Sequence, residues 1–433
     1  MKSPRDTGTK LTPYILIIVS CLLIVSLNSR DAEAARIDEL RQKIDEKNNT
    51  IKQLEEEIAQ FTKDVAETGK QAKTLESALK TLDLTRQKLV KDIALTENKI
   101  ATAELEIERL SFDITEKAVD IDVLRKALAR NMRIRNAEDQ NSLLEVLLAY
   151  KNLSTFWSEV DSLERFQASV QRHTGDLLQA KQQLESAKSD TEQKKKELED
   201  LTAGLGDQKK LVEINKKQKN DLLAQTKNKE GTYKKILSEK IALREAFERE
   251  LREFESELEI TIDPSKLPSA GKGVLAWPLD SIRITQYFGN TEFALAHAAL
   301  YSGIGHNGVD LAAAPGTQVK SAAAGVVEGA GDTDLVCPGA SYGKWVLIKH
   351  NNGLSTLYGH LSYVKAVKGD EVGRGDVVGY SGNTGYSTGP HLHFTVYATQ
   401  GVRVLDRKSK VCGGTYTMPV ADTKAYLNPL IYL

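Results

Sequence analysis

Proline is absent between Tyr14 and Asp263, although the 433-residue chain contains ten prolines. A compact domain of that size, rich in strands and turns, would normally use several prolines in its turns. Glycine is divided in the same way, since 24 of the 30 glycines lie after residue 263. The chain is therefore predicted to be a long helical module followed by a glycine-rich, all-β domain.

The charge of the chain excludes one class of partner. The formal net charge is −1, and no segment concentrates basic residues. Proteins that bind nucleic acid carry a basic patch or stripe. Nucleic acid is therefore not expected as a partner.

The N-terminus has the pattern of an export signal. Three basic residues precede the apolar run Ile15–Leu27, and Ala32-Glu33-Ala34 follows it with the small-residue spacing that signal peptidase accepts. The apolar run is short for a spanning helix, which needs roughly 20 residues. Residues 1–34 are thus predicted to be a cleaved signal peptide, or alternatively an uncleaved N-terminal anchor. In both cases the rest of the chain is exported to the periplasm or the cell-wall space.

Two cysteines remain after the signal segment, Cys337 and Cys412, and both lie in the C-terminal part. An exported protein matures where thiols can oxidise. A disulfide between the two is predicted, with two separate thiols as the alternative.

The helical module repeats with a period of seven. Apolar residues at two positions of each heptad predict a coiled-coil seam, and a continuous helix over this segment would be a rod of roughly 140 Å. Thirteen of the fourteen residues at the first position are apolar: Ile37, Ile44, Ile51, Ile58, Val65, Ala72, Leu79, Arg86, Ile93, Ile100, Ile107, Ile114, Ile121 and Leu128.

A second and less regular series of similar length begins at Leu163 and continues to Phe254. Two long helices of matched length over residues 36–262 are most simply packed as an antiparallel hairpin. The segment 129–160 would form its tip, where Leu144, Leu147 and Trp157 either fill the end of the coiled coil or dock a partner. Self-association through a parallel coiled coil is the other arrangement that the heptads allow.

Beyond a linker at 263–276, the pattern changes to short strands separated by glycine turns over residues 277–433. Six of the seven histidines lie here. His306 and Asp310 flank a glycine turn that leads into a strand, while His391 and His393 share one face of another strand. Two histidines and one carboxylate form the ligand set of a catalytic zinc site with an open fourth position.

These motifs identify a resemblance to the lysostaphin/LytM family of zinc metallopeptidases, which cleave peptide cross-bridges of peptidoglycan. The resemblance implies that His306, Asp310 and His393 bind one zinc ion. It also implies that His360 and His391 orient the attacking water and stabilise the oxyanion. The segments that carry it are Trp277-Pro278, Phe288-Gly289, Tyr358–Leu361 and Gly382–Phe394.

The pairing of an exported coiled coil with this domain also resembles the EnvC-type activators of cell-wall amidases. In that group the coiled coil docks on the membrane complex FtsEX, and the metallopeptidase-like domain has lost its zinc ligands. Here all five positions are filled, which favours a zinc endopeptidase acting in cell-wall remodelling or division. The alternatives are a non-enzymatic activator and a structural coiled-coil protein of the envelope.

Overall fold

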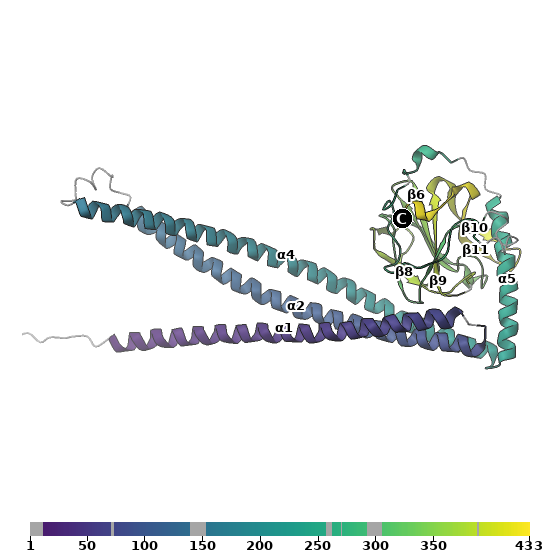
Figure 1. Ribbon diagram of the computed structural model, residues 1–433, viewed down its shortest axis with the longest axis horizontal. Coiled ribbons are helices and arrows are strands. Elements are labelled where there is room, and N and C mark those ends of the chain that lie inside the picture. Colours follow the sequence, from purple (N-terminus) through teal and green to yellow (C-terminus); the bar gives the residue numbers. More distant parts are fainter. Residues whose placement is uncertain are drawn as a thin grey trace, which may run out of the picture. The chain divides into compact units, whose positions relative to one another are not determined.

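The computed structural model describes residues 12–70, 73–138, 153–256, 262–269, 271–291, 305–387 and 389–433. Long helices occupy the first part of the chain and an antiparallel β domain occupies the last part (Figure 1), as the sequence predicted. Contacts group the chain into two compact units, Met1–Gln53 with Leu95–Leu205 and Leu54–Ala94 with Gly206–Leu433. The three longest helices contribute residues to both units.

The coiled coil is built from α1 (Thr12–Lys70), α2 (Leu75–Glu138) and α4 (Leu153–Thr226). Helix α2 is antiparallel to both α1 and α4, because residue numbers fall along one helix as they rise along its neighbour. The ion pairs that show these antiparallel directions are Arg36–Glu108 (2.8 Å), Glu57–Lys91 (2.5 Å), Glu106–Lys194 (2.8 Å) and Asp83–Lys219 (2.6 Å).

No helix within the described residues has an apolar stretch long enough to cross a membrane.

The first heptad series is not one continuous rod, and that expectation is wrong. Helix α1 ends at Lys70 and α2 begins at Leu75. The Thr74 hydroxyl accepts a hydrogen bond from the Ser77 amide at 3.1 Å, and the Thr74 amide donates to the Ser77 hydroxyl at 3.2 Å. This reciprocal cap begins a new helix within a continuous heptad pattern.

The expected tip lies largely outside the described residues, which include neither Leu144 nor Leu147. At the edge of this segment, Trp157 is 61% exposed on α4. Helix α2 ends at Glu138 and α4 begins at Leu153, and the tip between them stays a prediction.

The main sheet has the strand order β1-β2-β9-β6-β5-β4-β7, with β8 joining β6 to β3, and β12 pairing with β9. Strands β10 and β11 form a separate hairpin. The strands are β1 (Ile284–Gln286), β2 (Val309–Ala312), β3 (Gln318–Lys320), β4 (Gly325–Asp332), β5 (Lys344–His350), β6 (Leu354–Val364), β7 (Glu371–Val372), β8 (Val377–Ser381), β9 (His391–Ala398), β10 (Val402–Lys408), β11 (Thr415–Ala421) and β12 (Tyr426–Leu427).

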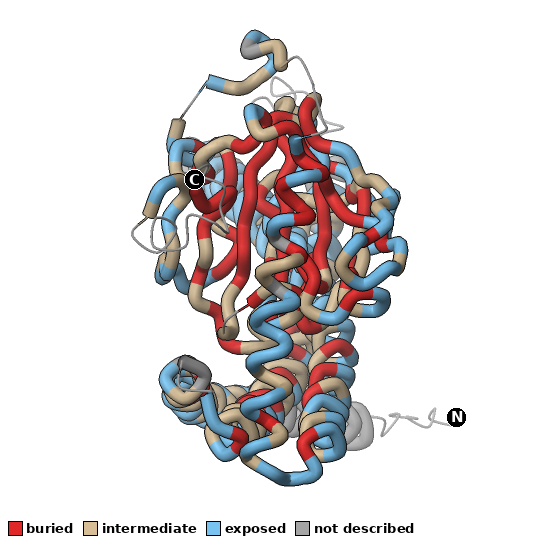
Figure 2. Tube along the Cα trace, turned by 90° about the vertical axis from the view of Figure 1, so that its right-hand side faces the viewer, coloured by how far each residue is buried: buried red, intermediate tan, exposed pale blue. Residues whose placement is uncertain are grey.

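Alternating side chains of the sheet fill two separate cores. On β5, Val346 and Ile348 belong to the first core, while Trp345 and Leu347 belong to the second. On β9, Leu392, Phe394 and Val396 enter the first core and Tyr397 enters the second. Buried residues are accordingly concentrated in the β domain (Figure 2).

The second core is completed by the hairpin β10–β11 and by helix α5 (Glu230–Ser256). Helix α5 lies beside this hairpin (Figure 1). Its residues Phe247, Leu251 and Phe254 are buried among strand residues. Glu250 of α5 accepts hydrogen bonds from the Ser409 hydroxyl at 2.7 Å and from the Lys410 amide. Helix α5 therefore packs as part of the β domain.

Cys337 and Cys412 form a disulfide in the structure, with their Cα atoms 5.9 Å apart. Cys337 is fully buried in the second core. The bridge ties the segment after β4 to the loop between β10 and β11.

Candidate metal and catalytic site

The pairing of β2 with β9 creates the site. In this antiparallel register Asp310 lies opposite His393, and Ala312 lies opposite His391. His306 precedes β2 and is held in place by an isolated bridge to Gly289. A Cβ on Gly308 would lie 2.6 Å from the Phe394 carbonyl oxygen, so the turn from His306 to β2 can approach β9 this closely only with glycine.

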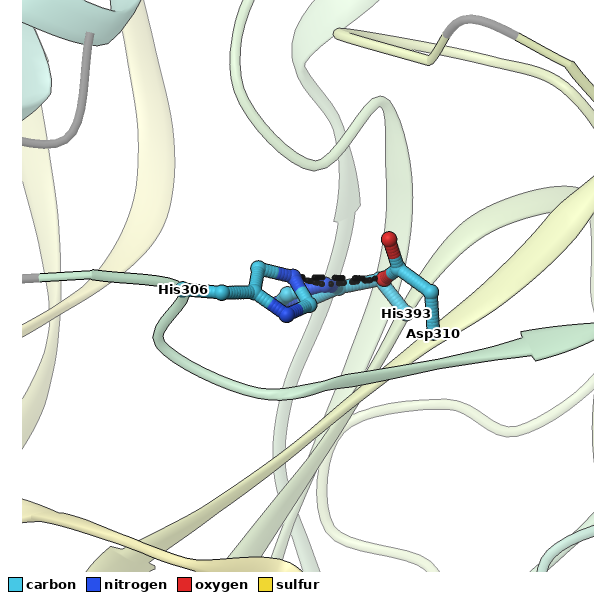
Figure 3. A group of neighbouring side chains, drawn as sticks. All are labelled: His306, Asp310 and His393. Carbon is cyan, nitrogen blue, oxygen red and sulfur yellow. Dashed lines mark hydrogen bonds and ion pairs between the residues drawn. The ribbon is translucent and has the colours of Figure 1, made fainter. Parts of the chain in front are cut away.

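Three side chains converge at this point (Figure 3). One possible ligand atom from each of His306, Asp310 and His393 lies within 4.8 Å of the others. The His393 Nδ1 atom is 2.9 Å from Asp310 Oδ1 and 3.2 Å from His306 Nε2. Two imidazole nitrogens and one carboxylate oxygen are the donor set of a catalytic zinc site with an open position.

The outer nitrogens of these imidazoles are already hydrogen-bonded. The His306 Nδ1 atom lies 3.1 Å from the Tyr287 carbonyl oxygen, so it carries the proton and donates. The His393 Nε2 atom lies 2.9 Å from the Thr395 hydroxyl. Such contacts fix the tautomer and ring orientation of a metal-binding histidine, leaving His306 Nε2 and His393 Nδ1 to face the shared point.

The loop 382–389 positions two further imidazoles. The Nδ1 atom of His360 donates to the Thr384 carbonyl oxygen at 2.8 Å, and that of His391 donates to the Gly389 carbonyl oxygen at 2.7 Å. The Nε2 atom of His391 lies 3.5 Å from Asp310 Oδ1. The His360 and His391 ring centroids are 4.8 Å apart, so both rings flank the three converging side chains.

The backbone of β6 is distorted where it supplies His360. Its φ of 60° lies in the left-handed region, which costs a side-chain-bearing residue about 1–3 kcal/mol. Before this residue β6 pairs with β9 up to Gly359 opposite His393, and after it β6 pairs with β8 from Leu361. The distortion therefore places His360 at the point where β6 changes its pairing partner from β9 to β8.

Burial and charge determine the protonation of the site. Burial alone would raise the pKa of Asp310, but the imidazoles of His391 and His306 hold that pKa well below its usual range. Burial lowers the pKa of His360 well below that of an ordinary histidine, and the neighbouring imidazoles of His391 and His393 lower it further. An ionised carboxylate is the form of Asp310 that a metal ion binds.

The structure brings all five expected site residues together, His306, Asp310, His360, His391 and His393. His350 is instead hydrogen-bonded away from the site, to the Ala324 carbonyl oxygen and the Thr356 hydroxyl. His297 lies outside the described residues. Two supporting groups were not predicted from the motifs. Thr395 lies two residues beyond His393 on the same strand face, and the Tyr287 carbonyl belongs to no side-chain motif.

Comparison with known proteins places this site in a family. Residues 304–405 match peptidase family M23. DD-carboxypeptidase/endopeptidase Mpg of Neisseria gonorrhoeae is 41% identical over 117 residues, which cover 27% of this chain and 25% of that protein. Peptidoglycan DD-endopeptidase ShyA of Vibrio cholerae is 43% identical over 90 residues, which cover 21% of this chain and 19% of that protein.

The chain thus spans about a quarter of the length of the Neisseria relatives that it matches. Among solved structures, the catalytic domain of lysostaphin from Staphylococcus simulans is 26% identical with a TM-score of 0.26, and the match covers 34% of this chain and 90% of that one. The matched segment contains His306, Asp310, His360, His391 and His393. Residues 304–405 are therefore a domain of peptidase family M23, the lysostaphin and LytM family that the motifs predicted.

Proposed function

We propose that this protein is a zinc-dependent endopeptidase that cuts peptidoglycan cross-bridge peptides outside the cytoplasm. The observation that carries the proposal is the convergence of His306, Asp310 and His393, flanked by two further imidazoles, inside an M23 domain. The names of Mpg and ShyA, a carboxypeptidase/endopeptidase and a peptidoglycan endopeptidase, support the same substrate class.

His306 Nε2, Asp310 Oδ1 and His393 Nδ1 would hold the ion. Zinc bound there would polarise the scissile carbonyl and lower the pKa of an attacking water. The fixed outer contacts of His306 and His393 keep both rings aimed inward without rearrangement.

His360 and His391 would handle the proton and the developing negative charge. Each donates through Nδ1 to a loop carbonyl, which leaves Nε2 of the neutral ring with a lone pair. A neutral imidazole can take the proton of the attacking water, and the imidazolium so formed can donate to the oxyanion or to the leaving amine. No HExxH glutamate exists in this chain, so histidine carries out the work of the base.

Metal analysis of the exported chain, combined with mass spectrometry of the muropeptides that it releases from purified sacculi, tests this proposal. About one zinc per chain and new peptide termini within the cross-bridge are expected. Stoichiometric zinc without any released peptide would instead favour an EnvC-like activator of amidases. Added amidase would then digest sacculi faster in the presence of the chain.

Because the helical module is not needed for zinc chemistry, we infer that it regulates or localises the enzyme. We propose that its tip, between α2 and α4, docks on a membrane complex of the FtsEX kind. Pull-down of that complex by the full chain, lost on replacement of Trp157 by Glu, is the expected result.

A further inference from the structure

We propose that Tyr342 is a positioning residue for His393 and His360, and that a buried row of tyrosines, Tyr342, Tyr397 and Tyr426, anchors it to Glu255 of helix α5. This inference rests on the proposed function, because it assigns a role in holding the histidines of that same site.

Tyr342 contacts the site in three ways. Its ring is stacked on the ring of His393, with centroids 5.9 Å apart and an interplanar angle of 29°. Its carbonyl oxygen accepts the His360 amide at 2.8 Å, and so supports the left-handed backbone there. Its ring also covers Gly359, where an added Cβ would lie 3.5 Å from the Tyr342 Cδ1 atom. One residue thus touches both a predicted metal ligand and a predicted catalytic histidine.

The hydroxyl of Tyr342 points away from the histidines into the second core. It lies 3.2 Å from the Tyr397 hydroxyl. The Tyr397 ring packs against the Tyr426 ring, with centroids 4.9 Å apart. Tyr426 donates to the Glu255 carboxylate, whose other oxygen accepts from Arg252 at 2.8 Å. The result is a path of hydrogen bonds and packed rings from helix α5 to the ring stacked on His393.

The two hydrogen bonds of the path lie at its ends. The Tyr426 hydroxyl donates to Glu255, and the Tyr342 and Tyr397 hydroxyls are hydrogen-bonded to each other. Burial raises the pKa of Tyr397 and Tyr426 well above the ordinary value, so both hydroxyls keep their protons.

The position of these tyrosines in the fold explains their effect. Side chains of β9 alternate between the two faces of the sheet, so His393 and Tyr397 lie on the same face. That face also carries the second core, into which Phe254 of α5 packs. Glu255 is only 1% exposed, and buried hydrogen bonds of this kind restrict the packing of α5 to one arrangement. The packing of α5 would therefore determine the positions of the Tyr342 and His393 side chains.

Three tyrosine-to-phenylalanine variants of the full chain test the inference. Tyr342→Phe and Tyr426→Phe keep the rings but interrupt the path. Tyr416→Phe is the matched control, because its buried hydroxyl also donates to α5, at Glu250 (3.5 Å), but stands outside the path. Each variant is compared with the unaltered chain for zinc affinity, by competition with a chromophoric chelator, and for hydrolysis of sacculi. The midpoint of thermal unfolding confirms that each variant is folded.

For Tyr342→Phe and Tyr426→Phe we expect zinc affinity to fall about tenfold, the lower end of the usual loss when a supporting contact of a metal ligand is removed. The maximal rate of muropeptide release should fall about tenfold, while the half-saturating sacculus concentration changes less than about twofold. Tyr416→Phe should stay within about twofold of the unaltered chain on all three measures.

Two outcomes would reject the inference and leave the proposed function intact. One is unchanged zinc affinity and rate in both path variants, and the other is an equal loss in all three variants, which would mean that α5 contacts matter only for stability. Failure of the unaltered chain to bind zinc at all would instead reject the proposed function itself.

Discussion

His360 combines an unfavourable backbone conformation with a proposed role that requires its imidazole. Glycine accepts a φ of 60° freely, whereas alanine does not. We predict that His360→Gly will have a free energy of unfolding about 1 kcal/mol higher than His360→Ala. Both variants should retain zinc and lose about 100-fold or more in activity. Urea unfolding monitored by fluorescence gives the comparison, and equal stability of the two would mean that the backbone stores no strain.

The three converging residues should be separable from the two flanking ones by metal content. His306→Ala, Asp310→Ala and His393→Ala each leave two protein ligands, so each variant should lose most of its zinc. His391→Ala should retain about one zinc per chain and lose activity. Atomic absorption after dialysis measures this directly. Zinc loss in His391→Ala would mean that the roles within the His391-Leu392-His393 pair are exchanged.

His350 makes the stability of the β domain sensitive to acid. Burial lowers its pKa in the folded state, although its hydrogen bonds to backbone oppose this shift. The unfolded chain binds a proton below about pH 6.5, where the folded chain does not, so stability is present above that pH and is lost as the pH falls. When the pH falls from 7.5 to 5.5, the free energy of unfolding should decrease by about 1 kcal/mol less in His350→Gln than in the unaltered chain. An equal decrease in the two proteins would contradict this prediction.

The residues of the candidate site could be predicted from sequence because they occur in short motifs. His391 and His393 share a strand face by period two, and the glycine turn after His306 brings Asp310 into register. The path through Tyr397 could not be predicted, because its members come from separate elements and no short motif joins them. Only the pairing of strands and the packing of α5 bring them together.

At the scale of elements, α5 determines where the β domain begins. Phe247 and Leu251 are each 2% exposed, and burying such a side chain contributes about 1.5–3 kcal/mol. A fragment of residues 265–433 lacks these side chains and uncovers the second core. We predict that it will unfold at least about 10 °C below a fragment of residues 229–433, or will aggregate.

Two leucines of α5 provide the matched control for that prediction. Within residues 229–433, Leu251→Ala should cost about 2–5 kcal/mol of unfolding free energy. Leu243 is 43% exposed on the same helix, so Leu243→Ala should cost less than about 0.5 kcal/mol. Equal thermal midpoints for the two variants would mean that α5 is only a linker.

The coiled coil was predictable as a class of structure but not as a path of the chain. The buried residues Leu40, Leu75, Leu89 and Leu110 occupy the second apolar position of the heptads, three residues after a member of the first series. A seven-residue pattern, however, has the same appearance whether the chain continues or reverses. The reversal before α2 depends on a cap between Thr74 and Ser77. This two-residue signal is weak beside a continuous pattern of fourteen heptads, so the helix end could not be predicted from it.

At the scale of the whole molecule, the parts of α2 and α4 that belong to the second unit contact strand β8, which leads to the loop beside the candidate site. Leu89 and Leu211 pack on Tyr380 of β8, and the Tyr380 hydroxyl donates to Asp207 at 3.3 Å. Strand β8 continues into the loop 382–389, whose carbonyls hold His360 and His391. A displacement of the helices could therefore reach both imidazoles.

We predict that the full exported chain will digest sacculi more slowly than residues 229–433, which lack these contacts. Binding of a partner need shift the balance between two states by only about 1.4 kcal/mol to change activity tenfold. Leu211→Asp in the full chain should raise its rate toward that of the fragment. Equal specific activities of the full chain and the fragment would leave the helices as a spacer.

The packing of α5 also imposes an order on biosynthesis. Helix α5 precedes in the chain every strand that it covers, so its apolar face stays uncovered during synthesis until β10 and β11 have followed. Exposed apolar surface of this kind is what chaperones bind. Tyr397 and Tyr426 also arrive late, after all five site residues have been made. A nascent chain that has made its histidines but not the strands that follow them would thus carry an incomplete site, and the proposed activity would wait for the end of synthesis.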